Sequence, residues 1–227
     1  MVLRIKFSNK NPARTQSRKT LAGIVKRRQN NKMQNKKIQV HKFLSELFGR
    51  ETTTFDLLAI IISSVSFALL TLFVKWNADI TIIKKIILTI LALDVGGGVV
   101  ANFTTGTNNY YAESLRKRYL FVLFHLLQPS ILIWILPNEL LAVLGVSIFT
   151  LISSIIVLNI KKHYNQRIVA VTLLLLCLIL STLLNYTDPL TKMIMQLFSI
   201  KLILAFSVNW DSTDKTETTT ENKTTTR

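Results

Sequence analysis

The chain has 227 residues, with 28 lysine and arginine residues against 12 aspartate and glutamate residues and a net charge of +16. Its mean hydropathy is nevertheless +0.37, because the charge and the apolar residues occupy different parts of the chain. Residues 1–50 hold 14 of the basic residues and one acid, Glu46, whereas most of residues 55–208 is apolar in blocks of 16 to 21 residues. Such blocks exclude a soluble core, a coiled coil, a disordered chain and a disulfide-stapled secreted module. The sequence predicts an all-α, polytopic membrane protein.

Residues 1–40 form the first predicted element. Asn, Gln, Lys and Arg dominate this stretch, which predicts a disordered basic segment in the cytoplasm. Its charge, together with the rest of residues 1–50, favours binding to anionic lipid headgroups of the bilayer. Nucleic-acid or ribosome binding is the alternative for a basic tail. The segment has neither aromatic stacking residues nor a recognisable motif, so the sequence argues against nucleic acid.

A short amphipathic helix is predicted within residues 41–54. The stretch His41–Gly49 places four large apolar side chains on one helical face, with Gly49 as a stop signal. These side chains are Phe43, Leu44, Leu47 and Phe48. We expect this helix to lie on the inner leaflet before the first span.

Six apolar windows predict a transmembrane domain over residues 55–208. A span needs about 20 apolar residues to cross a hydrocarbon core of ~30 Å. In chain order the windows are 55–74, 82–103, 119–136, 140–160, 168–184 and 193–208. The sixth is the weakest because it is short and contains Lys201. A shallow helix from which Lys201 snorkels to the interface is the preferred interpretation, and an ion pair with Asp94 is the alternative.

The distribution of basic residues predicts the orientation. With the N-terminus inside, 23 of the 28 basic residues fall on the inner side. Both termini are therefore expected in the cytoplasm, in an inner or plasma membrane. The last 19 residues, 209–227, form a Thr-rich tail without an apolar packing face, which predicts a disordered cytoplasmic tail.

Asp94 is the first polar feature within the spans. An ionised carboxylate at the centre of a span costs about 2.5–3.5 kcal/mol, so such residues are usually paired or functional. Three consecutive glycines follow it. At helical spacing one face carries Asp94, Gly97 or Gly98, Ala101, Asn102 and Thr105. This face indicates close approach of a ligand or, equally well, a tight helix-packing seam.

His125 is the second polar feature. Gln128 at i+3 and Arg118 at i−7 lie on the same face of the predicted third span. Pro129 has no N–H to donate, so we expect a kink and an unpaired carbonyl at His125. The alternative to a functional role is an interhelical hydrogen bond. The sequence has no HExxH or HxxxH spacing, so neither a metal site nor a cofactor is predicted.

The polar residues of the second, third and sixth spans are expected at similar depth and predict one cavity that faces the cytoplasm. The loop 104–118 would lie over its inner mouth. The predicted ligand-binding residues are Asp94, Gly97, Gly98, Asn102, Thr105, Asn108, Tyr111, Arg118, His125, Gln128 and Lys201.

Three functions are compatible with this pattern. The leading hypothesis is binding or transport of a small polar or amphiphilic ligand, since irregular backbone at membrane depth is tolerated where it lines a cavity. A membrane-embedded enzyme acting on a lipid headgroup is the second, with His125 as general base and Asp94 as the group that orients it or accepts a proton. The third is a structural or partner-binding membrane subunit. The sequence leaves the oligomeric state open.

Overall fold

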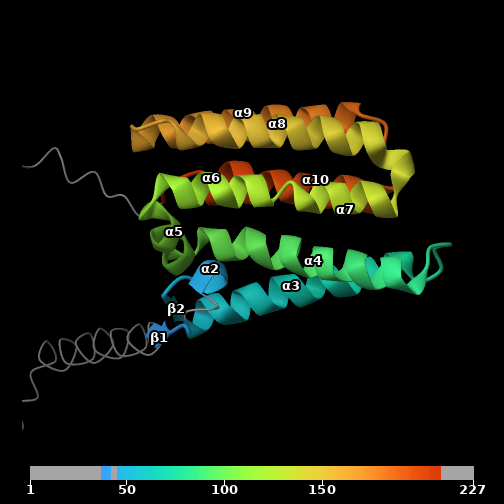
Figure 1. Cartoon of the computed structure of the whole chain (residues 1–227), viewed down its shortest axis with the longest axis horizontal. Helices are drawn as coiled ribbons and strands as arrows, with labels where there is room; N and C mark the ends of the chain where they lie inside the picture. Colours follow the sequence, from blue (N-terminus) through green and yellow to red (C-terminus); the bar gives the residue numbers. More distant parts are fainter. Residues whose placement is uncertain (1–36, 42–44, 211–227) are drawn as a thin grey trace, which may run out of the picture.

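The computed structural model describes residues 37–41 and 45–210 and is almost entirely helical (Figure 1). Six of its helices are long and apolar enough to cross a membrane, which confirms the predicted fold class. The predicted disordered tails lie outside the described residues, apart from 37–40 and 209–210. The spans are α3 (Thr54–Lys75), α4 (Ile82–Phe103), α6 (Leu115–Phe124) with α7 (Leu127–Ile135), η2 (Pro137–Glu139) with α8 (Leu140–Leu158), α9 (His163–Leu183), and α10 (Pro189–Ser199) with η3 (Ile200–Phe206).

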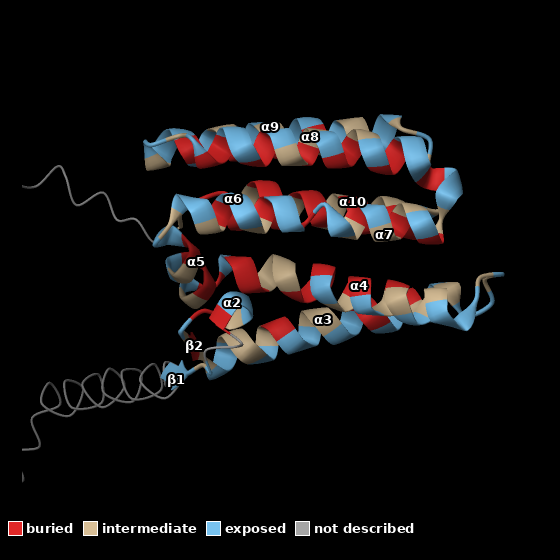
Figure 2. Ribbon diagram, in the orientation of Figure 1, coloured by how far each residue is buried: buried red, intermediate tan, exposed pale blue. Residues whose placement is uncertain are grey.

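The spans run roughly along one axis, with the α3–α4 hairpin on one side and the α8–α9 hairpin on the other (Figure 1). Between them lie α6–α7 and the sixth span. Buried residues follow the sides of the helices that face one another, and exposed apolar residues cover the outer sides (Figure 2). This distribution is the one expected when lipid surrounds a helical bundle.

The sixth span is the central helix of the bundle. Its α-helical half contacts α4, α8 and α9, and its π-helical half, η3, contacts the same three helices. In the most apolar 18-residue stretch of this span 61% of the residues are buried, against 22% in the corresponding stretch of α3. Lys201 is only 1% exposed, so the interpretation of Lys201 as a snorkelling residue on a shallow helix is wrong. The charge is accommodated because Asp94 of α4 lies beside it.

A seam of small residues holds the sixth span against α8 and α9. The hydroxyl oxygens of Thr150 and Ser199 are 2.8 Å apart, and the sulfur of Cys177 lies 3.3 Å from the Ser199 oxygen. All three side chains are fully buried. Small and hydroxylated side chains let membrane helices approach closely, so this seam has a packing role.

The third span is broken where the sequence predicted a kink. Helix α6 ends at Phe124 and α7 begins at Leu127, with Pro129 in the first turn of α7. The expectation that the His125 carbonyl is unpaired is wrong, because it accepts a hydrogen bond of 3.3 Å from the backbone N–H of Gln128. The break lets the backbone replace the bond that Pro129 cannot donate.

The segment before the first span differs from the predicted amphipathic helix. Its described helix, α2, is a single turn (Ser45–Phe48), and Gly49 ends it with a φ of +73°. Strands β1 (Lys37–Gln39) and β2 (Glu51–Thr53) pair in antiparallel fashion on either side of it. The all-α prediction therefore missed a small sheet outside the spans. Phe43 and Leu44 of the predicted apolar face lie outside the described residues.

The segment before the first span packs against helix α5 (Thr105–Ala112) at the end of the bundle. A Cβ atom on Gly49 would lie 2.0 Å from the carbonyl carbon of Gly106, so only two glycines permit the contact. The Tyr111 hydroxyl donates to the Glu46 carbonyl at 3.1 Å. At the same end, Trp210 N donates to Asn108 Oδ1 at 3.2 Å, so both ends of the described chain lie on one side of the bundle.

Candidate functional site

A cavity of about 570 Å³ lies between α4 and the broken third span, with η3 behind it and α2 and α5 at one end. Two backbone irregularities of the bundle border it, namely the α6–α7 break and the π-helical segment η3. Such irregular segments are frequent at functional sites. The predicted ligand-binding residues that line this cavity are Asp94, Gly98, Asn102, Tyr111, His125, Gln128 and Lys201.

An ion pair forms the polar floor of the cavity. Lys201 Nζ lies 2.9 Å from Asp94 Oδ2, and the two side chains are 2% and 43% exposed, respectively. Gly98 makes room for this pair, because a Cβ atom there would lie 2.4 Å from Lys201 Cε. The lysine is therefore enclosed behind the carboxylate, and the carboxylate faces the cavity.

Two amides beside the ion pair have unused hydrogen-bonding atoms. Gln128 Nε2 donates to Asp94 Oδ2, but Gln128 Oε1 is buried and has no partner among the described residues. The side chain of Asn102 is 4% exposed, and its Nδ2 has no partner within the described chain. Buried polar groups are normally hydrogen-bonded, so each of these atoms requires a partner that the described residues do not supply.

His125 is held by its own helix. Its Nδ1 lies 2.7 Å from the Phe121 carbonyl, to which it donates, and its ring packs at 4.1 Å from the Phe121 ring. The described bonds of the Asp94 side chain go to Lys201 and Gln128 rather than to the imidazole. Asp94 therefore does not form the hydrogen bond that would orient His125 as a general base.

The walls of the cavity are apolar and were not predicted from the sequence. They come from α4 and from both halves of the third span, namely Ile87, Ile90, Leu91, Phe121, Phe124, Leu127 and Ile131. Ile90, Phe124 and Leu127 are 58%, 70% and 51% exposed. An apolar residue within a span gives no sequence signal that separates a cavity wall from a lipid contact.

Four predicted residues lie elsewhere. Gly97 faces α3, where a Cβ atom would meet the Ser64 hydroxyl at 2.5 Å, so the packing-seam interpretation holds for this glycine. Asn108 Nδ2 donates to the Val208 carbonyl at 3.0 Å and fixes the end of the sixth span. Arg118 is 5% exposed with its guanidinium carbon 5.8 Å from the centre of the Phe206 ring. Thr105 lines a separate, smaller pocket.

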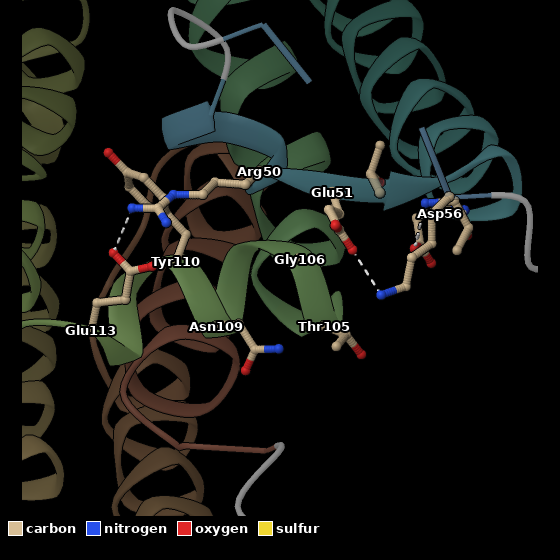
Figure 3. Close-up of a pocket in the computed structure, with 11 residues that line it drawn as sticks. Arg50, Glu51, Asp56, Thr105, Gly106, Asn109, Tyr110 and Glu113 are labelled. Carbon is tan, nitrogen blue, oxygen red and sulfur yellow. Dashed lines mark hydrogen bonds and ion pairs between the residues drawn. The ribbon is translucent and has the colours of Figure 1, made fainter. Parts of the chain in front are cut away.

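This second pocket, of about 260 Å³, lies between β2 and α5 (Figure 3). Four of its charged groups form ion pairs, Arg50 with Glu113 at 3.0 Å and Lys37 with Glu51 at 2.7 Å, and the Asp56 carboxylate accepts the backbone N–H of Thr53 in the capping box of α3. The hydrogen bond from Lys37 holds the pKa of the Glu51 carboxyl below its usual value. The pocket therefore joins the pre-span segment to α5, and each charged group that lines it already has a partner within the described residues.

Glu46 and Leu47 of α2 lie at the α5 end of the larger cavity. Burial raises the pKa of the Tyr111 phenol, so this hydroxyl remains a donor to the Glu46 carbonyl. The Thr107 hydroxyl donates to the Leu47 carbonyl at 3.2 Å. Two hydrogen bonds thus hold α2 across that end of the cavity.

No group of three or more His, Cys, Asp or Glu side chains that could hold a metal ion occurs within residues 37–41 and 45–210. Comparisons of the chain with protein-family models, with curated proteins and with solved structures gave no match.

Proposed function

We propose that this multi-pass membrane protein binds an amphiphilic ligand in the cavity between α4 and the broken third span. The observation that carries the proposal is the combination of a polar floor with apolar walls. Ligand pockets typically enclose about 300–1,000 Å³ and are mainly apolar with a few fixed polar groups. The cavity volume of about 570 Å³ falls within this range.

The rim of the cavity supports access from the bilayer. Three of its exposed residues, Ile90, Phe124 and Leu127, are apolar and lie within the spans. In a membrane such surfaces face acyl chains. A ligand with an apolar chain can therefore enter sideways between α4 and α7 and place its polar head near Asp94.

The opposite route is obstructed by α2, which lies at the α5 end of the cavity. A cytoplasm-facing opening is thus less well supported than a lateral one. Transport of the ligand between leaflets, rather than binding alone, would require α2 to move away from α5. An amphiphile is accordingly a better candidate than a small polar solute.

The orientation and location complete the proposal. The bias of basic residues toward the α5 end favours both termini in the cytoplasm of a plasma or inner membrane. The pre-span segment would then lie at the inner leaflet, where residues 1–50 can bind anionic headgroups. The cavity would lie in the cytoplasmic half of the bilayer.

Photo-cross-linking tests the proposal. A fatty alcohol that carries a diazirine near its hydroxyl should label peptides from the cavity face of α4 and α6–α7. Ile90→Trp should reduce this labelling at least fivefold, because the indole fills the rim. Leu141→Trp is the matched control, since Leu141 is 82% exposed on α8, away from the cavity. Equal labelling of wild type and Ile90→Trp would refute the proposal.

A further inference from the structure

We infer that the head of the bound amphiphile is uncharged and carries hydroxyl groups, as in a monoacylglycerol, and that a phosphate head is excluded. This inference rests on the proposed function and specifies its ligand class. It follows from the charges that face the cavity and from the unused hydrogen-bonding atoms of its floor.

The charges that line the cavity disfavour an anionic head. Among the described residues one cation lines the cavity, Lys201, which is 2% exposed and already paired with Asp94. The accessible charges are carboxylates, namely Asp94 on the floor and the exposed Glu46 at the α5 end. Arg118, the nearest basic residue along the third span, packs over Phe206 and does not line the cavity. A phosphate would therefore meet carboxylates without an available cation in the described lining, at a high desolvation cost.

A cationic head is also poorly matched. The Asp94 carboxylate is neutralised by Lys201 at 2.9 Å, so an ammonium group on the ligand would compete with a cation fixed in the bundle. Lys201 is enclosed by Gly98 and by α4, and the Asp94 carbonyl accepts a second bond from its Nζ at 3.4 Å. A neutral head leaves this pair intact.

The unused atoms of the floor require a ligand with both donors and acceptors. Asp94 Oδ1 and Gln128 Oε1 are acceptors that receive no hydrogen bond from the described residues. Asn102 Nδ2 is a donor without an acceptor in the same part of the chain. A hydroxyl group donates one hydrogen bond and accepts others, whereas a phosphodiester only accepts. Adjacent hydroxyl groups therefore satisfy this floor, and a phosphate satisfies Asn102 alone.

His125, which also lines the cavity, adds one more acceptor. Because Nδ1 donates to the Phe121 carbonyl, the neutral imidazole keeps its lone pair on Nε2. The cavity lining thus offers more acceptors than donors. This excess again favours a ligand that brings several O–H groups.

Competition between three lipids with the same acyl chain tests the inference. Monooleoylglycerol, oleoyl lysophosphatidic acid and oleylamine are titrated against the diazirine fatty alcohol on the full-length protein in neutral detergent. We expect monooleoylglycerol to displace the probe at a concentration at least tenfold below either charged lipid. Stronger displacement by a charged lipid would overturn the assignment of an uncharged head but would still support the cavity as the binding site. Failure of all three to displace the probe would refute the proposed function itself.

The variant Asn102→Leu provides a second measurement. It should raise the concentration of monooleoylglycerol that displaces the probe at least tenfold. The concentration of methyl oleate that displaces the probe should change less than twofold. Because the Asn102 amide has no partner in the described chain, the unliganded variant should unfold at the same or a higher temperature. A lower unfolding temperature with unchanged lipid preference would assign Asn102 to packing and overturn the inference. Thr172→Ala on the exposed face of α9 is the control.

Discussion

Lys201 Nζ and Asp94 Oδ2 are 2.9 Å apart although 107 residues separate them in the chain. The pair joins the second span to the sixth and lets a lysine occupy the centre of the bundle. It also determines the chemistry of the cavity, since the lysine is hidden and the carboxylate is accessible.

Breaking this pair should be costly from either side. Asp94→Asn leaves the more deeply buried Lys201 without its counterion and should lower the free energy of unfolding by about 3–5 kcal/mol. Lys201→Met should cost less, because Asp94 is 43% exposed and can recruit water. The double variant should recover much of the loss. Thermal unfolding of all four proteins in detergent measures the coupling, and simple additivity would contradict a direct pair.

Substitutions of Gly96 and Gly98 should have different effects, the first on stability and the second on ligand binding. Gly96→Ala brings a Cβ atom to 2.8 Å from Phe67 Cβ and 3.0 Å from the Ser63 carbonyl, so it should separate α3 from α4. We expect a loss of about 1–3 kcal/mol in stability. Gly98→Ala instead displaces the flexible end of Lys201 and should mainly weaken binding of the diazirine probe. Unfolding temperatures and probe labelling of the two variants separate these effects. A reversed pattern would contradict the assignment of each glycine.

The glycine contact between α2 and α5 should control docking of the pre-span segment. Gly106→Ala places a Cβ atom 2.1 Å from the Glu51 carbonyl oxygen, a clash with backbone that cannot be relieved by a side-chain movement. We expect proteolysis near residues 45–53 to rise at least tenfold, with the spans still folded. Gly145→Ala is the control, because its nearest contact is a Leu184 methyl group at 3.3 Å. Equal cleavage of both variants would argue against docking.

The stability of the protein should depend on pH through Asp188, which lies at the end of the bundle opposite α5. Burial raises the pKa of the Asp188 carboxyl, but hydrogen bonds from Lys75, Thr191 and Leu190 outweigh it, so the pKa lies below its usual value. A lowered pKa stabilises the fold above the unfolded value of about 4 and this contribution disappears as pH falls below it. We therefore expect the unfolding temperature to fall between about pH 4.5 and pH 3.

Asp188→Asn keeps a side chain that can cap α10 but removes the charge that pairs with Lys75 at 2.8 Å. At pH 7 it should lower the free energy of unfolding by roughly 1–2 kcal/mol. The difference from wild type should shrink as the pH falls below about 4, through the lowered pKa of the Asp188 carboxyl. A constant difference across this range would show that the charge of Asp188 does not matter.

The spans were predictable because apolar length is a local property of the chain. The predicted window 82–103 coincides with α4, and Gly49 ends a helix as expected. The role of Lys201 was not predictable with the same security, since it depends on a partner 107 residues away. The short strands escaped prediction because β1 and β2 are three residues each and pair across α2.

The polar half of the cavity was predictable and the apolar half was not. A carboxylate, an imidazole and an amide within spans are rare enough to attract notice, and Asp94, His125 and Gln128 do line one cavity. Gly97, which shares the glycine run with Gly98, faces α3 instead. One residue of helical rotation, about 100°, separates a packing contact from a cavity contact, and sequence spacing alone did not resolve it.

Native mass spectrometry of the purified protein tests the central claim most directly. Wild type and the control Leu141→Trp should each retain one amphiphile per chain after mild detergent exchange. Ile90→Trp, with the rim of the cavity filled, should lose it while keeping the wild-type unfolding temperature. Retention of the same molecule by Ile90→Trp at wild-type occupancy, or its absence from all three proteins after reconstitution with monooleoylglycerol, would contradict the assignment of this cavity as the binding site.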